Sequence, residues 1–333
     1  MNEVACDRLF QYMEECGFTR FFLYRPENFA WLTGGGDNTV AIGEGVGWLE
    51  IEAKKVRVHS SQIEASRFVE EEATGLEIVS HPWYTAPRMQ RPNDLDHDLT
   101  KLRLVLSSDE QRRLRSLGRD AARALEGVMR AARPDWTERA LASHIAAMLY
   151  EREIQPIVLL TAGEERMFQY RHPLPKDYLL NGAAMGVVCG RRGGLVINLT
   201  RIRVWNQPRV FSLYEKVLYM EAKALDASVP GARLGEVVEA IKKAYRKIGR
   251  LEAFEEHHQG GIAGYRPREI LGVPGEKTQL AIGMCLAWNP SLPGAKVEDT
   301  FLLTEEGLEN LTHDPDWPMV TVNGHPRPTI LTD

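Results

Sequence analysis

The chain has 333 residues, of which 44% are hydrophobic and 26% charged, and its formal net charge is −5. This length is typical of two domains, or of one large unit with an attached lobe, and the composition is that of a globular protein. The acidic balance argues against nucleic acid or an anionic membrane as the main partner. No stretch approaches the roughly 20 apolar residues that a membrane helix needs.

The N-terminal segment and the cysteines indicate a reducing compartment. Residues 1–7, MNEVACD, are charged and lack the apolar run of a signal peptide. The four cysteines are scattered without any C-x-x-C spacing, which argues against a disulfide framework or a zinc knuckle. The sequence therefore predicts a cytoplasmic protein.

Residues 1–100 are predicted to form a small α/β domain. Apolar spacing predicts helices over 6–16 and 62–72, and short apolar runs predict strands over 21–24 and 56–59. The polar stretch 91–98, RPNDLDHD, has the composition of a linker. We therefore place a domain boundary at residue 100, with a second domain over 101–333.

The second domain is predicted to begin with two helices. The segment SSDE (107–110) indicates an N-cap followed by acidic residues in the first turn, and the helix is expected to run to about residue 132. Thr137 is expected to cap the next helix. The remaining elements are predicted strands over 157–161, 185–189, 195–199, 284–288 and 300–304, and predicted helices over 210–227 and 233–248. Paired helices followed by short strands indicate an α+β fold, and the two halves fit an internal pseudo-duplication.

Three segments in the last third of the chain carry a family resemblance: EHHQGG (256–261), WNP (288–290) and KVEDT (296–300). Together with PENFAWLTG (26–34), they resemble the creatinase/aminopeptidase P/prolidase superfamily. This resemblance implies a C-terminal pita-bread domain, preceded by a smaller creatinase-like domain. In the metal-dependent members, the corresponding H-x-x-G, E-P-G and R-x-E-D segments help to build a two-metal centre.

The resemblance also identifies the positions where those members hold their metals with two Asp, one His and two Glu residues. In this chain the five positions are Cys189, Asn198, His258, Asn289 and Glu298. Three anionic oxygen ligands are therefore missing, although two cations 3.5–4 Å apart need several carboxylates. We predict that the site holds no dinuclear metal centre and no cofactor. A single zinc ion bound by Cys189, His258 and Glu298 is chemically conceivable, but a small buried thiol is the favoured interpretation of Cys189.

Creatinase shows that this fold can hydrolyse without a metal, and His258 lies at the position of its acid/base histidine. An imidazole without a metal titrates near neutral pH and can transfer a proton. His258 and Glu298 are the predicted catalytic residues. A buried Glu298 would need a partner, either a substrate cation or Arg201. His257, next in sequence, is expected to point to the opposite face of an extended backbone.

Further residues are expected to line the substrate pocket, because they lie beside these motifs in the sequence or because the family resemblance implies it. They are His172, Cys189, Asn198, Arg201, Tyr265, Arg268, Glu269, Trp288 and Asn289.

The sequence thus predicts a metal-independent, creatinase-like hydrolase that cleaves a C–N bond in a small polar molecule, for which amino-acid derivatives are one candidate class. Three alternatives stay open: a metal-dependent Xaa-Pro dipeptidase or aminopeptidase, a non-catalytic pita-bread binding protein, and an enzyme with Cys189 as nucleophile. The resemblance further implies a homodimer.

Overall fold

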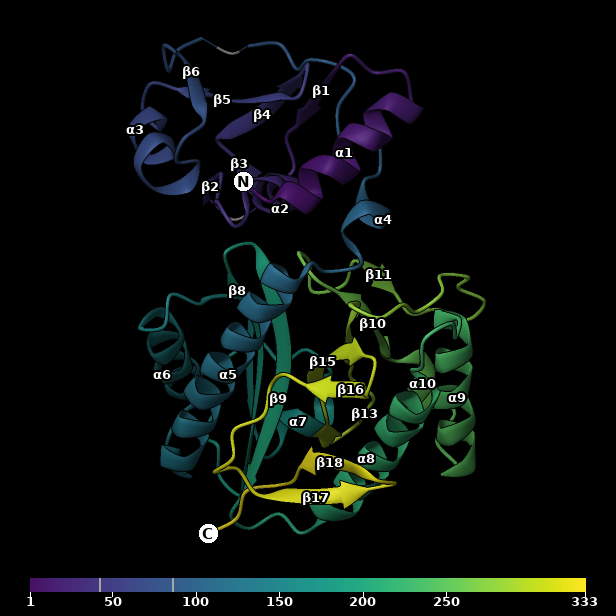
Figure 1. Ribbon diagram of the computed structural model, residues 1–333. Coiled ribbons are helices and arrows are strands. Elements are labelled where there is room, and N and C mark those ends of the chain that lie inside the picture. The colour runs from purple at the N-terminus through teal and green to yellow at the C-terminus, as the bar shows by residue number, and fades with distance from the viewer. Residues whose placement is uncertain (42, 86) are drawn as a thin grey trace. The chain divides into compact units, whose positions relative to one another are not determined.

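The computed structural model describes residues 1–41, 43–85 and 87–333. The chain forms two compact units (Figure 1). The first contains Met1–Leu104 and Gly193–Leu195, and the second contains Val105–Arg192 and Val196–Asp333. Among the described residues, no helix combines the length and the apolar character needed to cross a membrane.

The first unit is built around a four-stranded sheet with the order β1-β4-β5-β6, antiparallel except for the parallel pair β5 and β6. Its strands are β1 (Arg20–Leu23), β2 (Thr39–Ala41), β3 (Glu44–Gly45), β4 (Gly47–Glu52), β5 (Lys55–Ser61) and β6 (Glu77–His81). Its helical segments are α1 (Glu3–Glu15), α2 (Pro26–Thr33), α3 (Ala65–Arg67), the π-helical turn η1 (Phe68–Glu72) and α4 (Thr100–Arg103).

One sequence prediction in this unit needs correction, and β2, β3, β4 and β6 were not predicted. The helix expected over 62–72 is broken into α3 and η1. Strand β4 was missed because it joins β5 through the two-residue turn Ala53-Lys54, whose φ angles of 48° and 62° are unusual for residues with side chains. Such turns normally carry Asn or Gly, so the sequence contained no hairpin signal.

The second unit has two halves, each with a helix pair and an antiparallel sheet. The first half contains α5 (Ser108–Ala131), α6 (Glu138–Tyr150), β7 (Gln155–Gly163), α7 (Arg166–Gln169), β8 (Ala183–Arg192) and β9 (Leu195–Val204). The predicted caps are confirmed, because Ser107 accepts a bond from Glu110 N and Thr137 accepts a bond from Ala140 N. The structure adds a second bond, from the Ser107 backbone N–H to the Glu110 carboxylate.

The second half contributes a five-stranded sheet with the order β11-β10-β12-β15-β16. Its helices are α8 (Arg209–Ala227), α9 (Leu234–Lys247) and α10 (Glu252–Glu255). Its strands are β10 (Gly260–Ala263), β11 (Ile270–Leu271), β12 (Cys285–Trp288), β13 (Ser291–Leu292), β14 (Ala295–Lys296), β15 (Asp299–Thr304), β16 (Gly307–Asn310), β17 (Met319–Val322) and β18 (His325–Pro328). The sheets of the two halves meet where Thr200 of β9 bridges Glu298.

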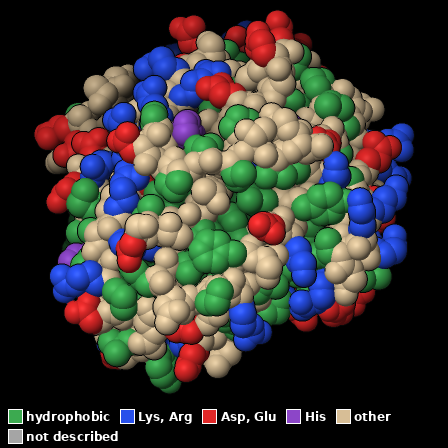
Figure 2. Space-filling model, turned by 90° about the horizontal axis from the view of Figure 1, so that it is seen from below, with side chains coloured by type: hydrophobic (Ala, Val, Ile, Leu, Met, Phe, Trp, Pro, Cys, Tyr) green, Lys and Arg blue, Asp and Glu red, His purple; other side chains and the backbone are tan. Residues whose placement is uncertain are grey.

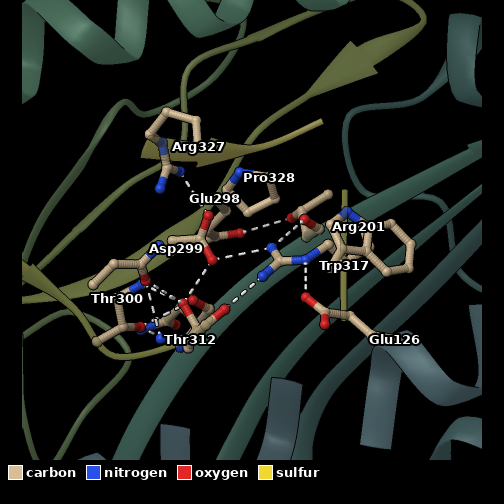
Figure 3. A network of polar contacts seen from close by, with 12 residues as sticks. Glu126, Arg201, Glu298, Asp299, Thr300, Thr312, Trp317, Arg327 and Pro328 are labelled. Carbon is tan, nitrogen blue, oxygen red and sulfur yellow. Dashed lines mark hydrogen bonds and ion pairs between the residues drawn. The ribbon is translucent and has the colours of Figure 1, made fainter. Parts of the chain in front are cut away.

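A buried ion network crosses this junction (Figure 3). Arg201 of β9 pairs with Glu126 of α5 at 2.5 Å and with Asp299 of β15 at 3.0 Å. Arg327 of β18 pairs with the same Asp299 and with Glu221 of α8, each at 2.6 Å. Removing one member of such a network leaves an uncompensated buried charge, so these residues hold the two halves together.

The surface at the β17 and β18 end of the second unit is chemically mixed. Figure 2 shows Lys and Arg side chains interspersed with Asp and Glu on this face, around hydrophobic side chains near its centre. Opposite charges at this spacing largely cancel at a distance. This face therefore presents no broad field of one sign.

Candidate active site

Glu298 lies at the junction of the two half-sheets, between β14 and β15, and is 2% exposed. Its carboxylate accepts a bond from Arg268 Nη2 at 2.8 Å, pairs with Lys296 Nζ at 3.2 Å and accepts a bond from Thr200 Oγ1 at 3.2 Å. Burial alone would raise the pKa of Glu298, but the two cations outweigh it and lower that pKa to about 2. Glu298 is therefore an ionised, fully engaged carboxylate.

Lys296 is the partner that sequence analysis missed. Two residues apart on an extended backbone, Lys296 and Glu298 project to the same side, and that spacing was the signal available in the sequence. Arg268 was expected to contact substrate, and its guanidinium instead reaches Glu298 from the segment before β11. Arg201 is not the partner of Glu298, because its donors bind Glu126, Asp299 and main-chain carbonyls.

Three histidines gather beside this carboxylate. His257 and His258 lie between α10 and β10, and His172 follows α7. The Nε2 atoms of His257 and His172 are 3.1 Å apart. Burial lowers the pKa of all three imidazoles, to about 2 for His257 and about 4 for His258. Positive charge nearby, from Lys296 or Arg268, lowers these pKa values further, so the neutral imidazoles prevail. The expectation that the His258 imidazole titrates near neutral pH is therefore wrong.

The prediction that His257 and His258 point to opposite faces is wrong. Their rings stack at 4.4 Å with an interplanar angle of 23°. The alternation of side chains holds only for extended strand, and strand β10 begins after both residues, at Gly260. Consecutive histidines can therefore face the same site.

The three substituted ligand positions lie in buried strands or directly after one. Cys189 is on β8, Asn198 is on β9, and Asn289 follows β12. The Gly193-Gly194 turn has φ angles of 53° and 77°, as a type I′ hairpin requires, and the register that such a turn sets places Cys189 opposite Asn198.

The polar atoms at these positions are largely unused. In the described part of the chain, neither side-chain polar atom of Asn198 has a hydrogen-bond partner, and the same is true of Asn289 Oδ1. Burial, with the Glu298 carboxylate nearby, raises the pKa of Cys189 to about 12, so this residue is a neutral thiol. A neutral thiol is a poor nucleophile, which argues against Cys189 as the nucleophile.

The remaining predicted pocket residues are bound into the surrounding structure. Tyr265 donates its hydroxyl to Glu110 at 2.7 Å, and its backbone N–H donates to Glu269 Oε1 at 2.9 Å. Trp288 is fully buried and donates its indole N–H to Ser228 at 3.0 Å. The structure thus assigns Trp288 to the core, in contrast to the predicted contact with substrate.

The residues present do not fit a two-metal centre. Two of the five family positions carry amides and one carries a neutral thiol, so only His258 and Glu298 could supply family-type ligands. Glu298 is already paired with Lys296 and Arg268. Two added dications would be repelled by these cations and would lack the carboxylates that normally neutralise them.

Comparison with known proteins identifies the family of this chain. A model of metallopeptidase family M24 matches residues 112–305. The chain is 26% identical over 262 residues to an Xaa-Pro dipeptidase of Lactobacillus delbrueckii subsp. lactis, covering 73% of this chain and 69% of the relative. It is 25% identical over 236 residues to an uncharacterized peptidase of Staphylococcus aureus, covering 66% of each.

Solved structures share the fold at low sequence identity. A prolidase from Pyrococcus furiosus superposes with a TM-score of 0.75 at 17% identity, covering 91% of this chain and 99% of that one. The N-terminal domain of the FACT complex subunit SPT16 from Cicer arietinum superposes with a TM-score of 0.66 at 13% identity, covering 94% and 97%. The family match spans more than half of the chain, and the fold agrees with it. The protein therefore belongs to metallopeptidase family M24, within the creatinase/aminopeptidase P/prolidase superfamily of pita-bread proteins.

Proposed function

We propose that this M24 protein is a hydrolase that cleaves a C–N bond in a small polar substrate, with His258 as general acid/base and without the two-metal centre. The observation that carries this proposal is the pairing of Glu298 with Lys296 and Arg268. These two cations pair with the carboxylate that, in the family's metal-dependent members, binds the metals. Amino-acid derivatives remain one candidate class of substrate.

The chemistry of the surrounding groups supports the role of His258. Its neutral imidazole can accept a proton from an attacking nucleophile and return it to a leaving nitrogen. Within the described residues, its Nδ1 has no hydrogen-bond partner, so this atom is not committed to the scaffold. Lys296 and Arg268 supply positive charge where a tetrahedral intermediate would develop negative charge.

The test compares hydrolysis by the wild-type chain and by His258→Ala on a substrate panel. The panel contains Xaa-Pro dipeptides and N-substituted amino acids of the creatine type, each assayed after exhaustive chelation and again with added Mn²⁺, Co²⁺ or Zn²⁺. We expect activity to survive chelation and kcat/KM to fall by about 10²–10⁴ in His258→Ala. The control is His144→Ala, on the exposed side of α6. Activity that appears only with two bound metal equivalents would refute the proposal.

A metal-dependent Xaa-Pro dipeptidase is the second candidate, favoured by the dipeptidase relative at 26% identity. Metal analysis of the purified protein separates the two candidates. The dipeptidase needs bound metal to cleave Xaa-Pro dipeptides, whereas the first candidate does not need the two-metal centre. A binding protein without catalysis is the third, suggested by the likeness to a FACT complex subunit, and absence of turnover across the panel would support it. A homodimer and a cytoplasmic location stay predictions; sedimentation velocity measures the first and cell fractionation the second.

A further inference from the structure

The three histidines of the site come close enough to share one ligand. His172, His257 and His258 each offer one ring nitrogen, and these nitrogens all lie within 4.8 Å of one another. His172 comes from the segment after α7, 85 residues before His257. The His172 and His257 rings meet edge to face, with centroids 4.9 Å apart. Folding thus brings three imidazoles from two distant segments of the chain into one cluster.

Two of these imidazoles have bonding capacity that the protein does not use. His257 is 7% exposed, and residues 1–41, 43–85 and 87–333 offer no partner for its Nδ1 or for Nδ1 of His258. A buried polar atom without a partner destabilises the folded protein. The free Nδ1 of His257 is on the other side of the ring from the Nε2 that meets His172, so the convergence of the three rings is the observation that points to a shared ligand.

We propose that His172, His257 and His258 form a site for a single divalent transition metal of the zinc class. In a tetrahedral centre with Zn–N distances of about 2.0–2.1 Å, two ligand nitrogens are roughly 3.3–3.4 Å apart. The 3.1 Å separation of the His172 and His257 nitrogens is close to this spacing. Three protein ligands leave one coordination position open for water, and His172 is exposed, which provides a path of entry.

This site differs from the family's two-metal centre in both ligands and metal preference. It uses His258 and none of the other four family positions, Cys189, Asn198, Asn289 and Glu298. Neutral imidazoles suit Zn²⁺, Co²⁺, Ni²⁺ and Cu²⁺, whereas Mg²⁺ and Mn²⁺ prefer carboxylates. The nearby charges are Lys296 and Arg268, which oppose a dication, and Glu298, which favours one. The net positive surroundings make the site selective for metals that bind imidazole strongly.

Metal binding here would regulate the site. The consequence rests on the proposed function: if His258 is the acid/base, a metal bound to its ring competes with proton transfer and inhibits hydrolysis. Binding itself does not depend on that function, so the two can be tested apart.

The experiment titrates untagged, chelator-treated protein with Co²⁺, followed by visible absorption, and with Zn²⁺, followed by calorimetry. We expect one equivalent of each metal with a tetrahedral Co²⁺ spectrum, and no stoichiometric binding of Mn²⁺. His172→Gln and His257→Gln are each expected to weaken binding by at least about 100-fold, whereas the exposed His144→Gln and the neighbouring Cys189→Ser leave it unchanged. Circular dichroism verifies that each variant is folded.

Three outcomes would contradict the proposed three-histidine metal site. They are the absence of stoichiometric Co²⁺ and Zn²⁺ binding, binding that persists in both His172→Gln and His257→Gln, and a thiolate-to-cobalt band that disappears in Cys189→Ser. The last would place the metal on Cys189, His258 and Glu298. Failure of the proposed function is a separate result. It would appear as hydrolysis by metal-free His258→Ala at the wild-type rate, and it would leave the metal titration of the wild-type protein unaffected.

Discussion

Glu298 and Asp299 are neighbours in the chain and both are buried, yet they belong to two different polar regions. Asp299 lies in the ion network with Arg201 and Arg327, at 3.0 and 2.6 Å. Glu298 faces the other side, toward Lys296 and Arg268. Strand geometry causes this division, because successive side chains project to opposite faces.

The two regions differ in which kinds of polar group lack a partner. On the Asp299 side, both carboxylate oxygens bind arginines, and Thr312 donates a further bond at 2.6 Å. On the Glu298 side, Asn198 and the histidine rings keep polar atoms without partners in the described chain. Glu126 Oε2 and Arg327 Nη1 of the network also lack a partner within the described residues, but each charged side chain there pairs with an opposite charge. Asn198 and the histidine rings are neutral groups, and neutral polar atoms left unpaired in a buried site are typical of ligand binding. Of these two consecutive residues, Asp299 therefore belongs to the scaffold and Glu298 to the candidate site.

The largest effect is expected from Arg327→Met, which removes the arginine that joins Asp299 to Glu221. The variant leaves two buried carboxylates short of a partner, so we expect a loss of about 3–5 kcal/mol in the free energy of unfolding, measured with urea. The matched control is Arg115→Met, which breaks a half-exposed pair with Glu309 and should cost about 0–1 kcal/mol. Equal costs would show that burial does not distinguish the network.

Glu298→Gln tests the charge on the site side through pH. The folded-state pKa of Glu298 is about 2, below its ordinary value of 4.5. The unfolded chain therefore takes up this proton first as pH falls, and the stabilisation is present above pH 4.5 and lost toward pH 2. We expect the wild type to lose on the order of 2–3 kcal/mol more than Glu298→Gln between pH 5 and pH 2. Parallel stability curves from urea unfolding would contradict the ion pairs.

Thr312→Val keeps the side-chain shape and removes the hydroxyl that donates to Asp299 and accepts from the Thr300 backbone N–H. Because one of the lost hydrogen bonds goes to a charged group, we expect a cost of roughly 1.5–3 kcal/mol in the free energy of unfolding. Thr304→Val is the control, since the Thr304 hydroxyl bonds a main-chain carbonyl in a partly buried turn. A Thr312→Val protein as stable as the control would weaken the contrast between the regions.

The smallest effect on stability is expected from Asn198→Leu. This substitution keeps approximate shape and removes polar atoms that have no partner elsewhere in the described residues, so unfolding should change by less than about 1 kcal/mol. The same substitution should impair hydrolysis if Asn198 lines the pocket. A stability loss larger than that of Thr312→Val would mean that Asn198 is part of the scaffold.

Local signals predicted much of the fold and little of the pairing within the site. The caps at Ser107 and Thr137 depend on residues three positions apart, so the sequence was sufficient to predict them. The Ala53-Lys54 turn carried no residue that favours positive φ. The contact of Trp288 with Ser228 links positions 60 residues apart, and no local pattern separates such a core tryptophan from one in a pocket.

The sequence by itself determined the α+β class, the superfamily and the replacement of carboxylates by Cys189, Asn198 and Asn289, because these depend on residue type and short spacing. Only the tertiary structure decided that Glu298 binds Lys296 and Arg268, that Arg201 belongs to the core network, and that His172 meets His257. Except for Lys296, these partners lie far apart in the chain. Their pairing depends on which strand faces meet when the two half-sheets pack together.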